Sequence, residues 1–494
     1  MATYYIDPTW TGTESGTEAE PFTTFAQVRA LYANTDTVLF KGGTTLNESV
    51  INNKNDVTFS SYGTGRAILA GDGIAINCFL QTGRTGVTVT NINFVNGVSQ
   101  CVKSQSGSHN FTITDCIISG GYDGLQCNAG DTLTIEDIEV FGCTRYGIRV
   151  EGGNNHTVSR VNVHDNGKTE GSGDNWDGFF LGNGSIGFVV QDSRAVNNGG
   201  LGFGSNFDFS AGLTGEDCIG TIRRCFADTG WMGISNSGAL DNTATLTVES
   251  CISINHARGN YEAHGSCTTH LVNCYAGGTP PLDRVDGEAC IKWAPPGSTG
   301  ALTVTNCIIL AANYDCAFAS DGGTTTVTAK NNSFSDEGTK AFYRDDDVNK
   351  TLAQFDALYT VTGTVTEDPQ LNPDYTLALT SPCLGTGDTS VLPLTDYSGR
   401  GFGNPTNMGV YSLPQLANNL LATNTGNTAD AQNYDGVWTS QAWATIPDNT
   451  RYYPMIEGTG ATLRAWDGNS VRIPSADATI TNYDVAQWKT RKEI

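Results

Sequence analysis

Residues 221–225 read Thr-Ile-Arg-Arg-Cys, and the same pattern returns as Thr247-Val-Glu-Ser-Cys251 and His270-Leu-Val-Asn-Cys274. The final positions of these copies lie 26 and 23 residues apart. A short pattern returning at such an interval is typical of solenoids, in which each repeat packs on its neighbours. We therefore predict a parallel β-helix in which each copy marks one turn.

The repeat extends well beyond these three copies. The others read Thr112-Ile-Thr-Asp-Cys116, Thr134-Ile-Glu-Asp-Ile138, Thr157-Val-Ser-Arg-Val161, Val189-Val-Gln-Asp-Ser193 and Thr303-Val-Thr-Asn-Cys307. The shortest interval, 22 residues, corresponds to one turn, and longer intervals fit the same turn with loop insertions. Five copies end in cysteine, and we expect these cysteines to stack as an inward column. Buried free cysteines behave as small hydrophobes, so the column predicts packing and not chemistry.

A second strand is predicted in each turn, usually after glycine, as in Gly147-Ile-Arg-Val150 and Gly202-Phe-Gly-Ser205. Side chains of a strand alternate between its two faces. Ile148 and Ile291 are therefore expected to point inward. The expected outward column consists of Arg149, Phe180, Gly204, Ser235, Tyr261 and Lys292.

The two ends of the chain differ from its middle. Phe25, Val28, Leu31 and Tyr32 follow Thr24 at helical spacing, which predicts an amphipathic helix that caps the first coil. We predict an all-β fold, a right-handed parallel β-helix over 1–412 with its N-terminal cap in 1–45. A polar linker at 413–433 is expected to precede a small C-terminal β module at 434–494. The many tryptophans and tyrosines of this module indicate oligomerisation, attachment to a larger assembly or sugar binding, in that order.

Composition excludes several classes of protein. The chain of 494 residues has 27 basic and 51 acidic residues, a net charge of −24, which disfavours binding to nucleic acid. No apolar stretch approaches the roughly 18 residues of a membrane span. Fourteen cysteines without a CxxC pair predict neither a disulfide scaffold nor a structural zinc site. Residues 1–8 show no signal peptide, so either a signal has been removed or the protein leaves the cell by another route, and we expect an extracellular or virion protein.

Several end motifs resemble the pectin-lyase-like superfamily of right-handed parallel β-helices. They are Tyr4-Tyr5-Ile6-Asp7-Pro8, Asp36-Thr-Val-Leu-Phe40, Asp368-Pro369, Ser381-Pro382, Asp396-Tyr-Ser-Gly399-Arg400 and Gly409-Val-Tyr411. The resemblance covers about residues 3–412. It implies the fold, but the superfamily contains polysaccharide lyases, glycoside hydrolases, epimerases, phage tailspikes and adhesins, so it leaves the activity open.

Loop insertions indicate where a site lies, because loops that leave successive coils at one corner form the walls of a groove. Two insertions, 167–176 and 277–288, leave between the predicted strands, and a third, 207–217, follows the second strand. Carboxylates, bases and aromatic rings in one groove are typical of polysaccharide sites. Counting along the repeats places His164 and Asp228 in one stack and His256 in the next. The predicted substrate-binding residues are His164, Trp176, Asp208, Trp231, Tyr261 and Trp293.

Two mechanisms fit this groove. Hydrolysis needs a carboxylic acid and a second carboxylate, for which Asp174 or Asp177 would pair with Asp228 or Asp208. Elimination at a uronate needs a base and a positive charge instead. The predicted catalytic residues, covering both cases, are Asp174, Asp177, Asp228, His256, Arg258 and Lys292.

The segment Asp174-Asn-Trp-Asp-Gly-Phe-Phe180 is similar to the calcium-bearing coils of family 9 pectate lyases. The resemblance implies a calcium ligand at Asp177, but the next coil has the glycine-rich residues 199–204 where that family has an acidic cluster. No metal site is therefore predicted and no cofactor is required, although calcium remains compatible with the chain. Another acidic stretch, Asp345-Asp-Asp347, is interpreted as a solvated turn.

Together these features predict a carbohydrate-active protein that binds and cleaves an extended polysaccharide. It resembles a phage tailspike depolymerase, with hydrolysis favoured over elimination. This resemblance implies a homotrimer and contact with other virion tail proteins. Two alternatives remain: a non-enzymatic virion or surface protein in which the coil is a spacer or adhesin, and a secreted bacterial polysaccharide lyase.

Overall fold

The structure, a computed structural model, divides the chain into two units, Met1–Tyr411 and Ser412–Ile494, which are described separately. It describes residues 1–412 except 74–75, 129, 168–175, 200–203, 211–216, 239–243, 282–288, 294–299, 321, 323–324, 336–340, 346–347 and 403–405. In the second unit it describes the backbone of 455–457, 462–466 and 471–472.

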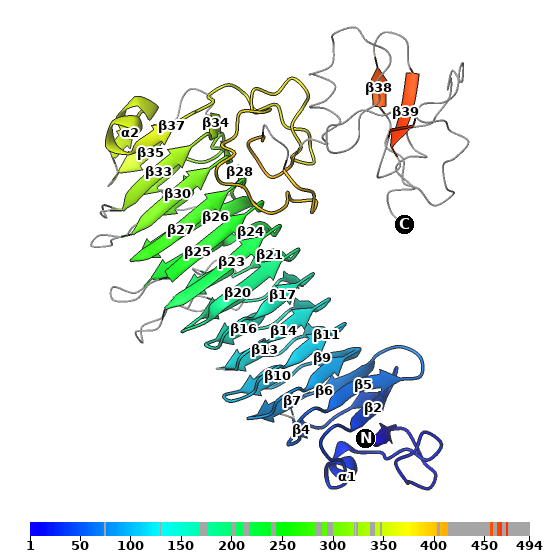
Figure 1. Cartoon of the computed structure of the whole chain (residues 1–494). Coiled ribbons are helices and arrows are strands. Elements are labelled where there is room, and N and C mark those ends of the chain that lie inside the picture. The colour runs from blue at the N-terminus through cyan, green and yellow to red at the C-terminus, as the bar shows by residue number, and fades with distance from the viewer. Residues whose placement is uncertain are drawn as a thin grey trace. The chain divides into compact units, whose positions relative to one another are not determined.

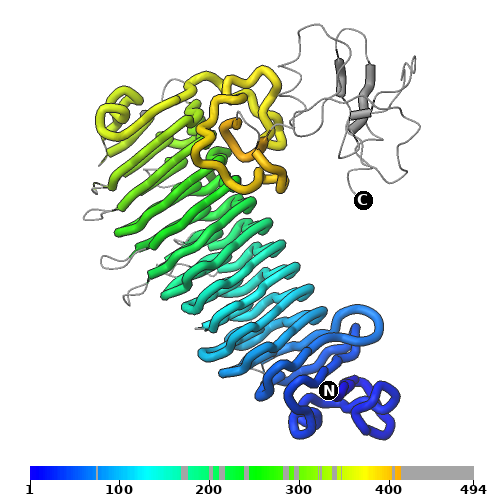
Figure 2. The backbone as a smooth tube through the Cα atoms, in the orientation of Figure 1, coloured from blue at the N-terminus to red at the C-terminus, as the bar shows by residue number. Residues whose placement is uncertain are grey.

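The first unit is a parallel β-helix, as the repeat predicts. Successive turns contribute strands to three ladders, so that strands far apart in the sequence lie side by side (Figure 1). Figure 2 shows the coils stacked in chain order. We name the ladders A, B and C, in the order in which a typical turn visits them. Ladder A forms one sheet, whereas ladders B and C belong to one continuous sheet.

Ladder A contains β1 (Thr3–Ile6), β2 (Thr37–Lys41), β5 (Thr58–Tyr62), β8 (Thr88–Thr90), β11 (Thr112–Thr114), β14 (Thr134–Glu136), β17 (Thr157–Ser159), β20 (Ile186–Gln191), β23 (Cys218–Arg223), β25 (Ala244–Glu249), β27 (Cys267–Val272), β30 (Ala301–Thr305), β33 (Thr326–Lys330) and β37 (Thr360–Thr362). Ladder B contains β3 (Thr45–Leu46), β6 (Ala67–Ala70), β9 (Ile92–Val95), β12 (Ile117–Ser119), β15 (Glu139–Phe141), β18 (Asn162–His164), β21 (Arg194–Asn198), β28 (Tyr275–Gly277), β31 (Ile308–Leu310) and β34 (Ser333–Ser335).

Ladder C contains β4 (Val50–Asn52), β7 (Asn77–Thr82), β10 (Gln100–Gln105), β13 (Asp123–Asn128), β16 (Ile148–Glu151), β19 (Phe179–Gly182), β22 (Ser205–Ser210), β29 (Ala289–Trp293), β32 (Cys316–Ser320) and β35 (Ala341–Asp345), with β36 (Val348–Lys350) antiparallel to β35. Two long strands, β24 (Phe226–Gly238) and β26 (Ile252–Gly265), pass through both ladders B and C.

The repeat accounts for the way the coils stack. Thr221 pairs with Thr247, and Thr247 with His270, so equivalent positions of successive copies are in register in ladder A. The predicted cysteine column is present: the Cys225 amide donates to Cys251 Sγ, and the Cys274 amide to Cys307 Sγ, both at 3.4 Å. All fourteen cysteines are buried and free. They fill the core as small apolar side chains.

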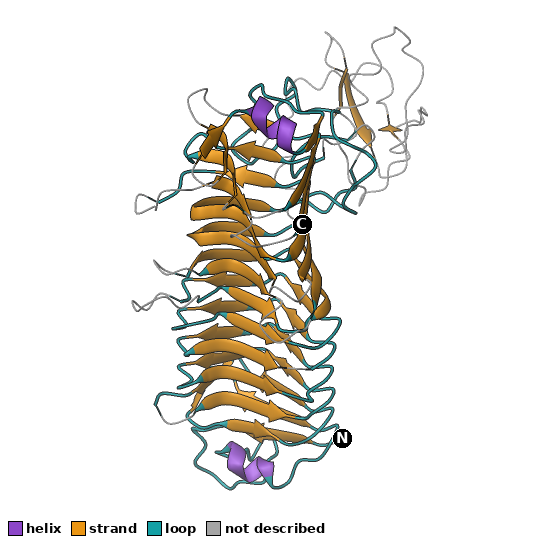
Figure 3. Cartoon of the chain, turned by 90° about the vertical axis from the view of Figure 1, so that its left-hand side faces the viewer, coloured by secondary structure: helices purple, strands orange, loops and turns teal. Residues whose placement is uncertain are grey.

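Helix α1 (Phe25–Arg29) begins directly after Thr24, where the sequence predicts a helix. Phe25 and Val28 are buried in the main core, and the Phe25 ring lies 6.2 Å from that of Phe59. A second short helix, α2 (Leu352–Leu358), lies at the other end of the solenoid (Figure 3). That α1 acts as a cap remains a prediction.

After α2 the chain packs against ladder B. Leu377, Met408 and Val410 share a buried cluster with Ile254 and Ile308. The Asn273 side chain donates to the main-chain carbonyls of Asn407 and Gly409, both at 3.0 Å. This C-terminal segment therefore covers part of the outer face of ladder B.

In the second unit the described backbone forms three short strands, β38 (Met455–Glu457), β39 (Thr462–Trp466) and β40 (Val471–Arg472). They are antiparallel. The predicted linker, module and oligomerisation otherwise fall outside the described residues. Where the chain is described, none of its helices has the length and apolar character needed to cross a lipid bilayer.

Candidate functional site

The outward column of ladder C carries most of the polar chemistry. Its members, in the order of the coils, are Arg149, Phe180, Asp208, Ser235, Glu262 and Lys292. Asp208 and Glu262 therefore stand at the two positions where Gly204 and Tyr261 are expected from the sequence. The expected column was wrong there, and the correction brings two carboxyl groups to the same face.

The reason lies in the register of β22 and β26. The described strand of the β22 coil runs over Ser205–Ser210, and Phe207 and Phe209 are its buried side chains. In β26, Tyr261 pairs with Ile234 and points into the core, where its hydroxyl donates to two main-chain carbonyls. A slip of one residue exchanges the two faces of a strand. Tyr261 thus lies in the core and not in a groove.

Asp208 lies beside a second carboxyl group, Asp177. The Ser205 amide donates to Asp177 Oδ1 at 2.6 Å, and the Ser235 hydroxyl donates to Asp208 Oδ1. The two serine hydroxyls are 3.0 Å apart, so Ser205 contacts Asp177 through its amide and Ser235 through its hydroxyl. Asp177 is 1% exposed, whereas Asp208 is only partly buried. Of the two, Asp208 is the one that a ligand can reach.

Burial raises the pKa of both carboxyl groups. For Asp177 the pKa lies well above its usual value, because burial and the neighbouring charge of Asp208 outweigh the Ser205 amide. For Asp208 burial again dominates, the Ser235 hydroxyl acts against it, and the charge of Glu262 adds to it. Each group therefore holds its proton to a higher pH than an ordinary aspartate.

Glu262, on the other side of Ser235 in the column, has the opposite character. Its Oε2 lies 2.7 Å from His264 Nε2 and 3.5 Å from Arg258 Nε. Burial raises the pKa of Glu262, but His264, Arg258 and Lys292 together outweigh burial and hold the pKa below its usual value. The site thus combines carboxyl groups whose pKa values are shifted in opposite directions, an arrangement that acid–base catalysis uses.

Aromatic rings lie next to the carboxyl pair, on the preceding coils. The Tyr146 ring is 5.6 Å from Trp176 and 5.5 Å from Phe180. The Arg145 guanidinium lies 5.2 Å from the Trp176 ring and 4.6 Å from that of Tyr122, which is 41% exposed. We call Tyr122, Arg145, Tyr146, Trp176 and Phe180 the aromatic platform. Of these, only Trp176 is among the sequence-predicted site residues.

Asp208 is among the predicted site residues, and the alternating run Asn206-Phe-Asp-Phe-Ser210 contains the signal that places it in the outward column. The sequence prediction did not include Tyr122, Arg145 or Tyr146. Arg145 is held by Asp123 through two hydrogen bonds of 2.6 and 2.7 Å. That pairing joins two neighbouring coils, and no local pattern predicts it.

Ladder B carries two of the predicted residues, away from the carboxyl pair. The stack that joins His164, Val196 and Asp228 is present as predicted. Asp228 Oδ1 accepts from Asn255 at 2.8 Å and from Thr229, and the charge of Asp228 acts on Tyr375 of the C-terminal segment. His164 stacks on Phe141 at 5.2 Å. Neither residue is brought to Asp208.

Three other predicted residues are buried. His256 is 0% exposed and its ring nitrogens lie 2.9 Å from Asn206 and Asn260. Trp293 is 1% exposed and stacks on Tyr343 at 5.5 Å. Trp231 belongs to a small buried cluster. These side chains support the walls of the coil and are not placed to touch a ligand.

Asp174 lies outside the described residues. The likeness of segment 174–180 to family 9 pectate lyases implies a calcium ligand at Asp177, but the surroundings of Asp177 do not fit one. Asp177 Oδ1 accepts an amide hydrogen, and the pKa values of Asp177 and Asp208 are both raised. Calcium sites use ionised carboxylates and carbonyl oxygens. Across the part of the chain that the structure describes, no three His, Cys, Asp or Glu residues are grouped to hold a metal ion.

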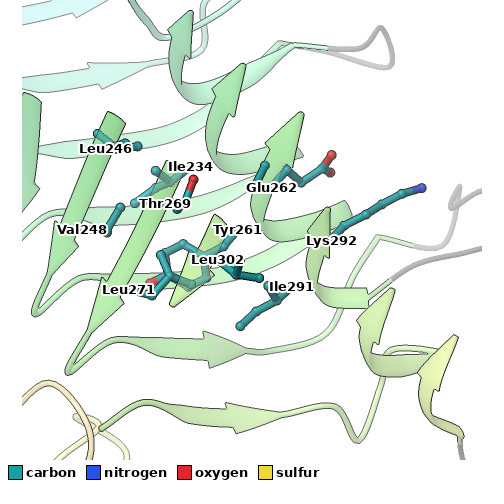
Figure 4. Close-up of a pocket in the computed structure, with 11 residues that line it drawn as sticks. Ile234, Leu246, Val248, Tyr261, Glu262, Thr269, Leu271, Ile291, Lys292 and Leu302 are labelled. Atoms are coloured by element: carbon teal, nitrogen blue, oxygen red, sulfur yellow. The ribbon is translucent and has the colours of Figure 1, made fainter. Parts of the chain in front are cut away.

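A small cavity lies under Glu262 and Lys292 (Figure 4). It measures about 10 Å³ and is lined mostly by core side chains such as Leu246, Val248 and Tyr261. Glu262 and Lys292 point away from these apolar side chains, toward the outside. The cavity has room for about one water molecule, so it is not a substrate site.

Comparisons with known proteins agree with the fold. The family described as "Right handed beta helix region" matches residues 31–211. Similar solved structures include XylC in complex with xylose, with 10% identity and a TM-score of 0.50 over 83% of this chain and 98% of that one. The catalytic unit of the GH87 alpha-1,3-glucanase from Streptomyces thermodiastaticus strain HF3-3 has 13% identity and a TM-score of 0.50 over 74% and 69%.

Pectate lyase Pel9A is 15% identical, with a TM-score of 0.43 over 83% of this chain and 96% of that one. At such identities the likeness concerns the fold alone. The comparison with curated proteins finds no similar sequence. The family model matches residues 31–211, and the three parallel ladders continue the same parallel β-helix fold beyond them, as far as β37 in ladder A.

Proposed function

We propose that the chain binds an extended polysaccharide along ladder C and cleaves it by hydrolysis at Asp208. One observation carries the proposal: a partly exposed carboxyl group with a raised pKa lies on the same outward column as an ionised one, Glu262. In the proposed hydrolysis a carboxylic acid protonates the leaving oxygen, water then adds to the sugar cation and gives its proton back to the same carboxylate, and nearby negative charge stabilises the cation.

Asp208 is the proposed general acid. Its raised pKa keeps the proton available, and its partial exposure lets it reach the glycosidic oxygen. The Glu262 side chain is 0% exposed, so we assign it an electrostatic role in which its negative charge acts without touching the sugar. Asp177 positions the β22 strand through the Ser205 amide.

The aromatic platform supplies a binding surface next to this acid. Aromatic faces stack on the C–H surfaces of sugar rings, and Tyr122 and Trp176 are accessible for such stacking. The Arg145 side chain, held between Asp123 and the rings, keeps the platform in place. The proposal rests on the chemistry of these residues, because the glucanase and XylC are similar to this chain in fold alone.

Elimination is the less favoured reaction because of where its candidate bases lie. His256 is buried, and both its ring nitrogens have partners. Arg258 lies beside Glu262. Lys292 follows Glu262 in the column and lies one coil further from the aromatic platform. A protein with a purely binding or structural role is the remaining alternative.

We further propose that the protein acts outside the cell or on a virion, as a tailspike-like depolymerase. In this proposal residues 434–494 form the module that makes the homotrimer or attaches it to other tail proteins. The tryptophans of that segment support it, because aromatic residues are enriched at protein interfaces.

The decisive experiment incubates the full chain with pectic, alginate, bacterial-capsule and O-antigen polysaccharides while reducing ends and ultraviolet absorbance are followed together. We expect reducing ends without absorbance, the result of hydrolysis. New absorbance would indicate elimination, and the absence of both signals across the panel would favour the binding or structural role.

Variants assign the activity to ladder C. Asp208→Asn keeps the size of the side chain but removes the acid, so we expect cleavage to fall by about a hundredfold or more. Asp228→Asn, a matched carboxyl change on ladder B, should leave the rate within about twofold. Equal losses in the two variants would contradict the assignment, and circular dichroism checks that both remain folded.

A further inference from the structure

A second hollow lies where the coils turn from ladder C toward ladder A, away from the carboxyl pair. It measures about 660 Å³ and opens where β13, β16 and β19 end. Its polar lining comes from Ser106, Asn128, Glu151, Asn154, Asn183 and Asp217. The volume lies within the range of roughly 300 to 1,000 Å³ that ligand sites occupy.

Hydrogen bonds across three coils organise this hollow around Glu151. The carboxylate accepts from Asn183 Nδ2 at 2.7 Å and from Asn128 Nδ2 at 3.0 Å. It also pairs with the Arg149 guanidinium at 2.7 Å. Each of these residues comes from a different strand end, except Arg149, which shares β16 with Glu151. The polar groups are therefore held in place before any ligand arrives.

Arg149 joins the hollow to the aromatic platform. Its guanidinium lies 5.1 Å from the Tyr146 ring and 5.8 Å from the Phe180 ring, in addition to its bond with Glu151. Glu151 is in register with Gly182, and Gly182 with Ser210, two residues beyond Asp208. From the strand spacing and the rise per residue, the main chains at Glu151 and Asp208 are about 12 Å apart. That separation corresponds to a few sugar rings.

The lining also selects the chemistry of a ligand. Among the described residues that line the hollow there are three amides, one hydroxyl and two carboxylates, but no Lys, Arg or His. Amides and hydroxyls bond to sugar hydroxyls and acetamido groups. Because Glu151 is paired with Arg149, the described lining offers no unpaired cation for a uronate or a sulfate, whereas its carboxylate oxygens can accept hydrogen bonds from hydroxyl or ammonium groups. The hollow therefore suits a neutral sugar or an amino sugar.

We propose that this hollow is a remote subsite, which binds a neutral or amino sugar a few positions away from the bond cleaved at Asp208. This inference rests on the proposed function. Interactions with remote parts of a substrate raise kcat as well as affinity, because they help to hold the reacting bond in place. Cleavage should consequently become faster once a chain is long enough to reach Glu151.

The test uses oligosaccharides of graded length, made by partial acid hydrolysis of the polysaccharide that the panel identifies. Ile186 lines the hollow and is 41% exposed, so Ile186→Trp fills the space without disturbing the core. Ile219 is its in-register neighbour on the next coil, is 40% exposed and is not part of the lining. Ile219→Trp is therefore a matched control.

We compare kcat/KM on the longest oligosaccharide with kcat/KM on the shortest one that is cleaved. The ratio of the first to the second should fall at least tenfold in Ile186→Trp. It should change less than twofold in Ile219→Trp. Asn183→Gly, which suits the left-handed backbone of that residue (φ 52°) and removes one amide, should lower the ratio as well. A ratio that Ile186→Trp leaves unchanged would overturn the subsite while the proposed function stands.

The products provide a second readout. Mass spectrometry and NMR identify the sugars two and three positions from the cleaved bond on the side of the hollow, and we expect them to be neutral or amino sugars. A uronate or sulfated sugar at both positions would overturn the proposed chemistry. If no polysaccharide is cleaved, the proposed function fails, and the subsite fails with it.

Discussion

At the scale of single residues, the site depends on how neighbours shift the pKa values of three carboxyl groups. Burial raises the pKa of Asp208, and the charge of Glu262 adds to it. For Glu262 the cations around it outweigh burial and lower the pKa. Two side chains of nearly identical chemistry thus have their pKa values shifted in opposite directions, because burial dominates for Asp208, whereas His264 and Arg258 help to outweigh burial for Glu262.

Ser235 tests the role of Asp208 through the pH profile. Its hydroxyl donates to Asp208 and stabilises the ionised form, so it acts to lower the pKa of Asp208. Ser235→Ala should raise that pKa further and move the alkaline limb of kcat/KM to higher pH, since the acid then keeps its proton longer. Ser237→Ala, two residues along the same strand, should leave the limb in place. An unchanged limb in Ser235→Ala would argue against Asp208 as the acid.

His256 makes the fold sensitive to acid. Burial lowers the pKa of its ring from 6.5 to about 4, although its bond with Asn260 acts against this. As the pH falls from 6.5 toward 4, the unfolded chain takes up a proton that the folded chain does not. This group alone should reduce the free energy of unfolding by about 3 kcal/mol at pH 4.

Urea denaturation of the wild type and of His256→Asn at pH 7 and pH 4 isolates this effect. We expect the difference in free energy of unfolding between the wild type and His256→Asn to be about 3 kcal/mol smaller at pH 4 than at pH 7. An advantage that is equal at the two pH values would show that the ring is not held neutral in the folded chain.

At the scale of the structural elements, side-chain amides join the coils at the corner between ladders B and C. Asn198 Nδ2 donates to the Val163 carbonyl at 3.0 Å and to Asn206 Oδ1 at 2.9 Å, and its Oδ1 accepts from Asn166 at 3.0 Å. All three asparagines are buried. Because buried polar groups are costly without partners, this row of asparagine side chains favours one register between coils.

Asn198→Ala should therefore destabilise the first unit more than its lost volume implies. Each polar group left without a partner costs about 1 to 3 kcal/mol, so we expect a loss of about 2 to 5 kcal/mol in urea denaturation. Asn197→Ala, at the adjacent partly exposed corner position (φ 56°), serves as a comparison. A smaller loss of free energy of unfolding for Asn198→Ala than for Asn197→Ala would contradict the role of the asparagine row.

At the scale of the whole molecule, the two units have separate contact networks. The first has its own core, including the cluster that its C-terminal segment forms with ladder B. A chain ending at residue 412 should therefore unfold at the same temperature as the first unit of the full chain and should keep its activity per site.

The same truncation tests the proposed trimer. Light scattering should give the mass of three chains for the full protein and of one chain for residues 1–412, if the tail is the oligomerisation module. Equal oligomeric states would assign the contacts between subunits to the solenoid instead, and a monomeric full chain would exclude the trimer.

Much of the fold could be predicted from the sequence because the information is local and repeated. Thr221, Thr247 and His270 recur at intervals close to one turn, and the alternation of apolar and polar residues identifies Ile148 and Arg149 as inward and outward. Hydrophobic alternation acts on each strand separately, so no knowledge of distant contacts is needed.

The candidate site was harder to predict, because it depends on the register between coils. Asp208 and Glu262 reach the same outward column only when β22 runs over Ser205–Ser210 and Tyr261 points inward. Insertions of different length precede these strands, and hydrogen bonds to the neighbouring coil then set which residue faces outward. The repeat in the sequence determines that the chain forms a β-helix. Pairing between coils determines which carboxyl groups lie together, because a register shift of one residue keeps the repeat nearly intact but turns outward side chains inward.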